Sequence, residues 1–178
     1  MRIAYADPPY PGQSARHYGD HADYAGEVDH AALIARLQDE FDGWVLHTGS
    51  KGLHVVVPLL PSEARVMAWV KPFSAFKRNV SVAYAWEPVI VKACRKPVVA
   101  YRFVMRDWIS EPMTTRRGLV GVKPEAVCRW AFEVVGAQPD DELHDLFPGT
   151  GAVMIAWEAW RAQVRLVPPI TEQLELER

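Results

Sequence analysis

Arg2-Ile3-Ala4-Tyr5-Ala6-Asp7-Pro8-Pro9-Tyr10 is the stretch of sequence that decides the fold. Residues 2 to 6 are mostly apolar and predict a buried strand. The two prolines fix φ and stiffen the turn that follows this strand. An acid therefore stands at the carboxyl end of a strand, three residues before an aromatic side chain. The alternative interpretation is a strand that simply ends in a proline turn.

This pattern suits the chemistry of an amino group on a nucleobase. Asp7 and the carbonyl of Pro8 can both accept a hydrogen bond from one exocyclic NH2, whose lone pair is otherwise delocalised into the ring. Two acceptors favour sp3 geometry and aim the lone pair at an electrophilic methyl group, and Tyr10 offers a flat face to an extruded base. Asp7, Pro8, Pro9 and Tyr10 are thus the predicted catalytic residues.

A second informative segment is Asp145-Leu146-Phe147-Pro148-Gly149-Thr150-Gly151, which precedes a mostly apolar run over residues 152–160. The pattern predicts a strand, a glycine turn and a helix. Glycines at 149 and 151 permit positive φ and close approach of a ligand, and a helix start presents free N–H groups. Such a loop can hold the methionine or phosphate part of a cofactor; an ordinary tight turn is the alternative.

Strand and helix patterns alternate along the chain. Strands are expected at 2–6, 43–47, 65–70, 82–91 and 143–147, and helices at 31–41, 124–135 and 152–163, with Asp29 as a cap and Pro124 at position N1. The segment 50–61 fits either a helix and strand or an irregular crossover. The alternation predicts a mainly parallel sheet with helices on both faces and ligands at the carboxyl ends of its strands. Asp7 and Asp145 both lie there if their strands are adjacent.

The ordered motifs resemble a circularly permuted amino-methyltransferase that uses S-adenosylmethionine (SAM). The acid-Pro-Pro-aromatic motif comes first and the glycine loop last. Between them, residues 83–91 resemble the family's hairpin, and Gly121-Val122-Lys123-Pro124 before a helix resembles its cofactor segment. The likeness spans residues 2 to 160. Within the family, the chain is similar to the permuted branch that includes the eukaryotic mRNA adenosine methyltransferase. It implies a Rossmann-like class I methyltransferase sheet, circularly permuted and short at its C-terminal end.

The resemblance implies methyl transfer from SAM to adenine N6 in DNA, because Asp-Pro-Pro-Tyr is more typical of adenine enzymes; cytosine N4 and RNA stay open. It implies a bacterial or phage-infected cytoplasm, and it leaves open whether the setting is restriction-modification, phage protection or regulation. The loop after the catalytic turn, with His17 and Tyr18, would hold the substrate. The residues implied in cofactor binding are Asp145, Phe147, Gly149, Gly151 and Lys123.

One departure from the family pattern concerns the cofactor ribose. Ordinary members continue into a strand that ends in a ribose-binding acid, whereas here only residues 165–169 could form a short strand before a charged tail, with 164–178 as the whole terminal segment. Glu158 falls inside the expected helix. The departure motivates an alternative function, a non-catalytic nucleic-acid-binding or scaffolding subunit. It also makes a homodimer or a partner subunit plausible.

Composition supports a compact enzyme. The chain has 178 residues, 49% of them hydrophobic, which predicts one domain over 1–178 without a membrane span. Cys94 and Cys128 lack C-x-x-C spacing, which favours free thiols in the cytoplasm. His17 and His21 have helical ligand spacing, but no further cluster completes a site, so no metal is expected.

Charge is unevenly distributed along the sequence. The net charge is −2, but residues 65–129 hold 13 Lys and Arg against 4 Asp and Glu, between two acidic flanks. Localised positive charge is typical of a phosphate-binding face, whereas charges that balance in space are the alternative. Residues 97–118 are expected to be a basic insertion that carries part of this surface. The predicted phosphate contacts are Lys77, Arg78, Arg116 and Arg117.

Overall fold

A computed structural model describes residues 1–12, 26–73, 80–97, 104–113 and 122–166. These residues form a six-stranded sheet in the order β5-β3-β4-β2-β1-β6. The strands are β1 (Arg2–Ala6), β2 (Gly43–His47), β3 (Arg65–Val70), β4 (Trp86–Lys92), β5 (Trp108–Ser110) and β6 (Glu142–Asp145). The helices are α2 (His30–Glu40), α3 (Leu53–Val56), α4 (Glu125–Val134) and α5 (Ala152–Leu166), with 3-10 turns η1 (Ser50–Gly52) and η2 (Val57–Leu59).

The sheet is mainly parallel, as predicted. β1 pairs in parallel with both β2 and β6, and β3 pairs in parallel with β5. β4 is antiparallel to both of its neighbours, β2 and β3, so it runs against the rest of the sheet. All five residues of β2 are buried, because helices cover both faces of the central strands.

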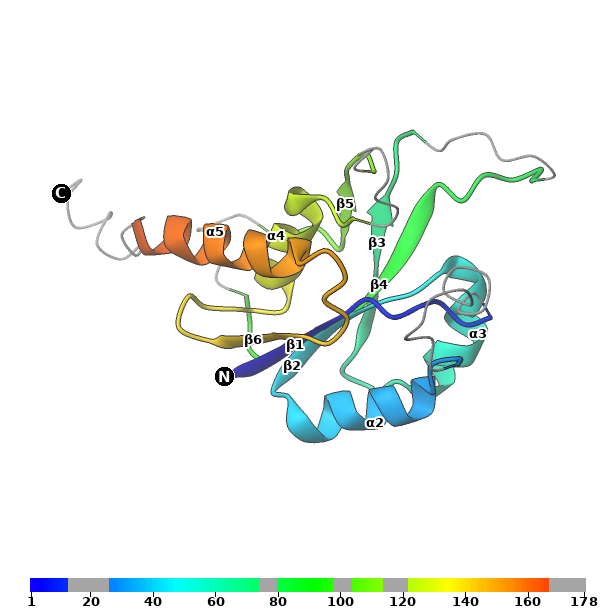
Figure 1. Cartoon of the computed structure of the whole chain (residues 1–178), viewed down its shortest axis with the longest axis horizontal. Coiled ribbons are helices and arrows are strands. Elements are labelled where there is room, and N and C mark those ends of the chain that lie inside the picture. Colours follow the sequence, from blue (N-terminus) through cyan, green and yellow to red (C-terminus); the bar gives the residue numbers. More distant parts are fainter. Residues whose placement is uncertain (13–25, 74–79, 98–103, 114–121, 167–178) are drawn as a thin grey trace.

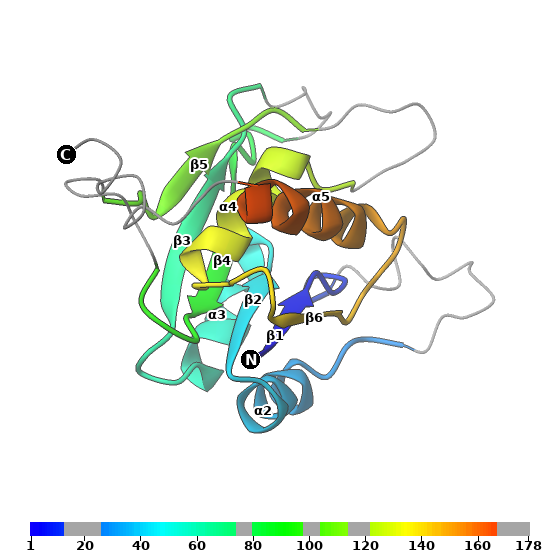
Figure 2. The same ribbon diagram turned by 90° about the vertical axis from the view of Figure 1, so that its left-hand side faces the viewer.

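Helices form a layer on each side of the sheet. Figure 1 shows α4 and α5 above the strands and α2 below them, and Figure 2 shows the same layers after a quarter turn. Phe132 of α4 packs edge-on against Trp157 of α5, which stacks on Trp160 with ring centroids 5.0 Å apart. Both tryptophans are buried, so they pack in the core between the helices and the sheet. The prediction of helices on both faces is confirmed.

Helix α2 follows its sequence pattern closely. Asp29 Oδ1 accepts a hydrogen bond from the backbone N–H of Ala32 at 3.0 Å, so the predicted cap is present. Leu33, Ile34 and Leu37 are buried under the sheet. The spacing of apolar residues therefore fixed both the position and the inward face of this helix.

Several expected boundaries were wrong in detail. Pro124 is the N-cap of α4 and not its first residue, because its ψ of 141° is extended. The strand expected at 82–91 begins only at Trp86. The expected strand at 165–169 is wrong at its start, since Arg165 and Leu166 continue the amphipathic helix α5. The undecided segment 50–61 is a run of short helical turns, and the basic segment 97–118 contributes the edge strand β5.

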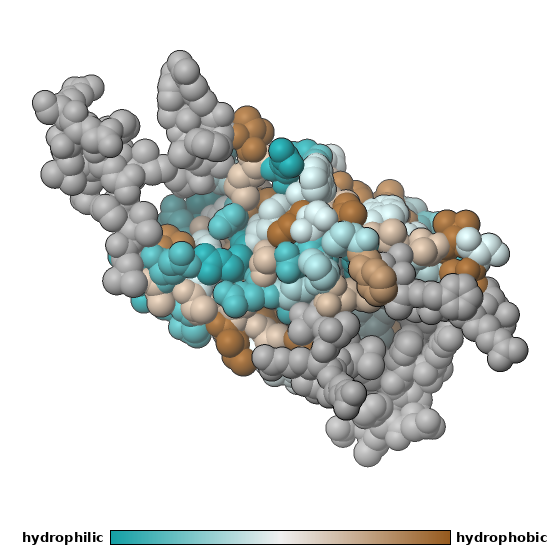
Figure 3. All heavy atoms as spheres, turned by 90° about the horizontal axis from the view of Figure 1, so that it is seen from above, coloured by the Kyte–Doolittle hydropathy of each residue, from teal (hydrophilic) through white to brown (hydrophobic). Residues whose placement is uncertain are grey.

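No helix in the described part of the chain is long and apolar enough to cross a membrane. Both cysteines are free thiols, as expected, and Cys128 is buried in α4. Seen from above the sheet, hydrophilic and hydrophobic side chains are mixed over the described surface (Figure 3).

Candidate active site

The candidate site lies at one edge of the sheet, where several strands bring functional side chains together. β1, β2, β3 and β6 run in one direction, so the residues at or just after their last positions share this edge. β4 runs the other way, so its amino end lies at the same edge, with Glu87 opposite Trp69 of β3. Asp7, His47, Lys71, Glu87 and Asp145 come together for this reason.

The two predicted acids end neighbouring strands. Tyr5 of β1 is opposite Asp145 of β6, and the backbone N–H of Leu146 donates to the carbonyl of Tyr5 at 2.9 Å. The condition set by the sequence, that the strands of Asp7 and Asp145 be adjacent, is therefore met. This arrangement puts the acid-Pro-Pro-aromatic turn beside the glycine turn.

Within the described residues, one carboxylate oxygen of Asp145 has a hydrogen-bond partner and the other has none. Its Oδ1 accepts a hydrogen bond from the backbone N–H of Phe147 at 3.2 Å. Its Oδ2 is buried and has no partner among the residues that the structure describes. Burial, and secondarily the charge of Asp7, raise the pKa of the Asp145 carboxyl. A buried acceptor of this kind is ready to receive a hydrogen bond from a cationic ligand group.

The glycine turn has the predicted backbone conformation. Gly149 has a φ of 46° and Gly151 a φ of 75°, both in the left-handed region. The N–H of Gly151 donates to the carbonyl of Pro148 at 2.7 Å, and α5 begins at the next residue. A Cβ at Gly151 would have no atom of the described chain within 4 Å, so the turn leaves space beside the helix start.

The acid-Pro-Pro-aromatic turn packs on the loop after β2. A Cβ on Gly49 would lie 2.9 Å from Cδ2 of Tyr10, and a Cβ on Gly52 would lie 2.9 Å from Cδ of Pro11. Both glycines are therefore needed for this close approach. The ring of Tyr10 is only partly exposed, because Gly49 lets it lie directly against the loop.

Lys123 joins Asp7, the predicted catalytic acid, to a second, buried acid. Its Nζ lies 2.9 Å from Asp7 Oδ1 and 2.8 Å from Glu87 Oε1, and it also donates to the hydroxyl of Tyr10 at 3.4 Å. Although burial alone would lower the pKa of the Lys123 ammonium, Asp7, Tyr10 and Glu87 raise it well above its usual value. Lys123, expected to contact the cofactor, contacts Asp7 in this structure; its contact with a cofactor stays a prediction.

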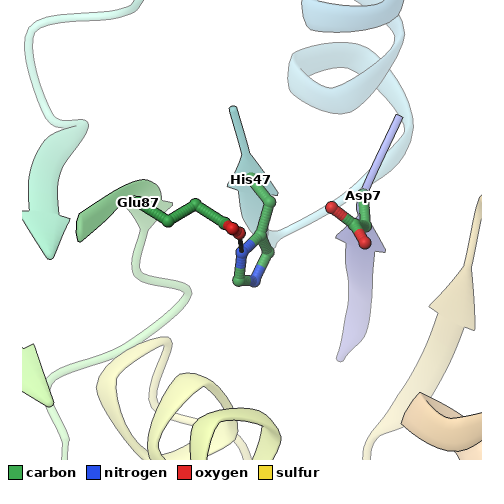
Figure 4. Close-up of side chains that lie close together, drawn as sticks. All are labelled: Asp7, His47 and Glu87. Atoms are coloured by element: carbon green, nitrogen blue, oxygen red, sulfur yellow. Dashed lines mark hydrogen bonds and ion pairs between the residues drawn. The ribbon is translucent and has the colours of Figure 1, made fainter. Parts of the chain in front are cut away.

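Behind Glu87 lies a set of polar side chains that the sequence analysis did not assign to the site. His47 Nδ1 lies 2.8 Å from Glu87 Oε1, and His47 Nε2 lies 2.7 Å from the hydroxyl of Tyr5. Lys71 donates to Glu87 Oε2 at 2.9 Å. Figure 4 shows Glu87 reaching the ring of His47, with Asp7 at the end of the neighbouring strand. The available signal was a charged residue and a histidine within otherwise apolar strands.

Asp7, His47 and Glu87 each offer an atom within 4.8 Å of the others, a spacing that could suit a metal ion. The ammonium of Lys123, however, bridges the two carboxylates, and both nitrogens of His47 have partners. A lysine cation thus takes the place that a metal would need. These side chains do not fit a metal in this arrangement.

The other predicted substrate residues are not tested. His17, Tyr18, Lys77, Arg78, Arg116 and Arg117 all lie outside the described residues. Several cations in the described part of the basic segment have internal partners, such as Arg65 with Asp107 and Arg95 with Asp141. The prediction of a phosphate-binding face therefore depends on the residues that the structure does not describe.

The architecture is a Rossmann-like α/β fold. The chain is similar to the crystal structure of the M1.HpyAVI–SAM complex, with a TM-score of 0.61 and 18% sequence identity over 90% of this chain and 78% of that one. It is also similar to the crystal structure of M1.HpyAVI, with a TM-score of 0.53 and 18% identity over 90% and 76% of the two chains. No family model and no curated protein sequence matches the chain. The circular permutation stays a prediction.

Proposed function

We propose that this chain transfers a methyl group from SAM to the exocyclic amine (N6) of adenine in DNA. The observation that carries the proposal is the adjacency of the two acids. Asp7 follows β1 and Asp145 ends β6, and these two strands pair in parallel. A site for the acceptor amine and a site for the cofactor can therefore share one edge of the sheet.

The residues around the glycine turn fit the methionine part of SAM. Asp145 Oδ2 is buried without a partner among the described residues, so it can accept a hydrogen bond from the α-ammonium group. The turn from Gly149 to Gly151 leaves room beside the start of α5. When bound, SAM supplies an electrophilic methyl group on its sulfonium sulfur. The complex of M1.HpyAVI with SAM, on a similar fold, supports this choice of cofactor.

The acceptor side uses the catalytic turn. Lys123 engages Asp7 Oδ1, which leaves Oδ2 and the Pro8 carbonyl to accept hydrogen bonds from the two hydrogens of the amine. Tyr10, partly exposed beside this turn, would stack on the base. Alignment of the amine lone pair and stabilisation of the positive charge that develops on nitrogen supply the catalysis. The surplus proton leaves to water or to Asp7.

The proposal can be tested by incubating the purified chain with methyl-deuterated SAM and unmethylated DNA, followed by nucleoside mass spectrometry. We expect deuterated N6-methyladenine, and we expect Asp7→Asn to abolish it. Asp39→Asn, which changes an exposed acid on α2, is the matched control and should leave the product unchanged. N4-methylcytosine, or methylation of RNA alone, would replace the substrate in the proposal.

Cofactor binding can be measured separately by calorimetric titration with S-adenosylhomocysteine. We expect binding in the wild type and a weaker affinity in Asp145→Asn, which keeps the shape of the side chain but removes its charge. Binding without any methylated product would favour the alternative, a non-catalytic nucleic-acid-binding subunit. Absence of both would contradict the proposed function.

A further inference from the structure

A buried chain of hydrogen bonds runs from the catalytic acid into the interior of the sheet. It passes from Asp7 to Lys123, then to Glu87, His47 and Tyr5, with successive distances of 2.9, 2.8, 2.8 and 2.7 Å. Tyr5 and His47 are 0% exposed and Glu87 is 4% exposed, so water does not compete along this part of the chain.

The donors and acceptors of the chain are mutually consistent. Burial favours the neutral form of Glu87, but Lys123, His47 and Lys71 hold the pKa of its carboxyl well below the usual range. An ionised Glu87 can only accept, so His47 Nδ1 donates to it, and in the neutral imidazole Nε2 then accepts from Tyr5. Burial raises the pKa of the Tyr5 phenol well above its usual value, so this hydroxyl keeps the proton that it donates.

This chain fixes the position of one ammonium group. Lys123 ends a flexible side chain whose rotamers would otherwise be free, but its Nζ lies between two carboxylates. Glu87 can hold Nζ in place because His47 and Lys71 restrain both of its oxygens. The held ammonium in turn engages a single oxygen of Asp7.

We propose that Lys123 is a positioning residue, anchored by Glu87, His47 and Tyr5, that holds the Asp7 carboxylate in one orientation with one oxygen free for the substrate amine. This inference rests on the proposed function, because it assigns Asp7 to the amine. It adds that residues without contact to substrate or cofactor set the geometry of the reaction. Small errors in such alignment cost about a hundredfold in rate.

Charged and titratable groups face this chain from every surrounding element. Lys71 approaches from the end of β3, Cys128 from α4 and Asp145 from the end of β6, while Tyr10 lies on the catalytic turn. Trp69 of β3 also lies 5.4 Å from Lys123 Nζ, measured to its ring centroid. A substitution at His47 keeps all these residues, so its effect on activity reports on the chain of hydrogen bonds itself.

The test compares two substitutions at His47. His47→Leu removes both hydrogen bonds, whereas His47→Asn keeps a donor near the place of Nδ1 and so keeps the bond to Glu87. We expect kcat of His47→Leu to fall by roughly tenfold to a hundredfold, with the KM for SAM and the affinity for S-adenosylhomocysteine unchanged. His47→Asn should recover most of kcat. Equal losses in the two variants, or a loss confined to KM, would overturn the proposal.

A second measurement follows the Lys123 ammonium itself and needs no activity. In protein labelled with ¹³C at lysine Cε, the Lys123 resonance can be assigned by its loss in Lys123→Arg. We expect it to titrate at a lower pH in Glu87→Gln and in His47→Leu than in the wild type, because its anchor is weakened. An unchanged titration would refute the anchoring. If the wild type methylates no nucleic acid, the proposed function fails. The titration still shows whether Glu87 and His47 anchor the Lys123 ammonium.

Discussion

Replacing Lys123 by Met tests how much the buried charges stabilise the fold. The substitution removes an ammonium that lies within 2.9 Å of two carboxylates and whose side chain is 6% exposed, and it keeps most of the side-chain volume. Removing one partner of a buried ion pair typically costs about 3–5 kcal/mol. Here the lower value applies, because Lys71 still holds Glu87 and Asp7 is 22% exposed.

We therefore expect the free energy of unfolding of Lys123→Met to fall by about 3 kcal/mol. For a chain of this size that corresponds to a decrease in Tm of roughly 6–12 °C. Urea unfolding followed by circular dichroism measures the first quantity, and thermal unfolding the second. Lys96→Met, which changes an exposed lysine, is the control and should stay within about 0.5 kcal/mol of the wild type.

The double variant Lys123→Met/Glu87→Gln gives the sharper test. Each single substitution leaves a buried charge without one of its partners, but the double variant removes both charges together. We expect it to cost less than the sum of the two single changes by about 1–3 kcal/mol. If the two effects add within about 0.5 kcal/mol, the two groups do not interact and the reasoning is refuted.

Three further predictions concern other parts of the molecule. Gly49→Ala places a Cβ 2.9 Å from the ring of Tyr10 at an ordinary φ of −80°, so we expect kcat to fall by about tenfold or more without weaker binding of S-adenosylhomocysteine in calorimetry. In Gly151→Ala the new Cβ has no neighbour within 4 Å, but the residue must keep a φ of 75°. We expect the free energy of unfolding in urea to fall by about 1 kcal/mol, and the affinity for S-adenosylhomocysteine to decrease. The ion pairs of Asp141 lower the pKa of its carboxyl from 3.8 to about 2, so they contribute stability above pH 3.8 that is lost as pH falls toward 2. Asp141→Asn should therefore be less stable than the wild type by about 2 kcal/mol at pH 6, and the difference should shrink as pH approaches 2 in urea titrations.

Strands β1 to β4 could be predicted from the sequence because most of their residues are apolar, whereas the edge strand β5 was not expected. The alternation of strands and helices predicted a mainly parallel sheet. The pairing of β1 with β6, which makes Asp7 and Asp145 adjacent, was only a condition of that prediction, and the structure meets it. The glycine turn was predicted because positive φ strongly favours that residue type. These features depend on local pattern, which a single sequence displays.

The rest of the site could not be predicted because it depends on which strands pair. The sequence indicated a hairpin arm over residues 82–91 but not its partners, and Glu87 reaches this edge because β4 lies between β2 and β3 and runs antiparallel to both. His47 ends a strand of apolar residues and offered no signal of its partners. Lys123 was expected near the cofactor from the resemblance, but its contact with Asp7 arises from the tertiary position of the segment before α4.

The pairing of β1 with β6 also bears on how the molecule folds. The amino group of Met1 binds Asp141, a partner 140 positions away along the chain. Strand β1 pairs with β6 over the same sequence separation. Closing a loop of this length costs about 4 kcal/mol in chain entropy, and contacts so distant in sequence form slowly. During synthesis, Asp7 leaves the ribosome long before Asp145 does. The turns that follow β1 and β6 can therefore meet only when the sheet closes, so a nascent chain that ends before residue 142 should lack the proposed cofactor site.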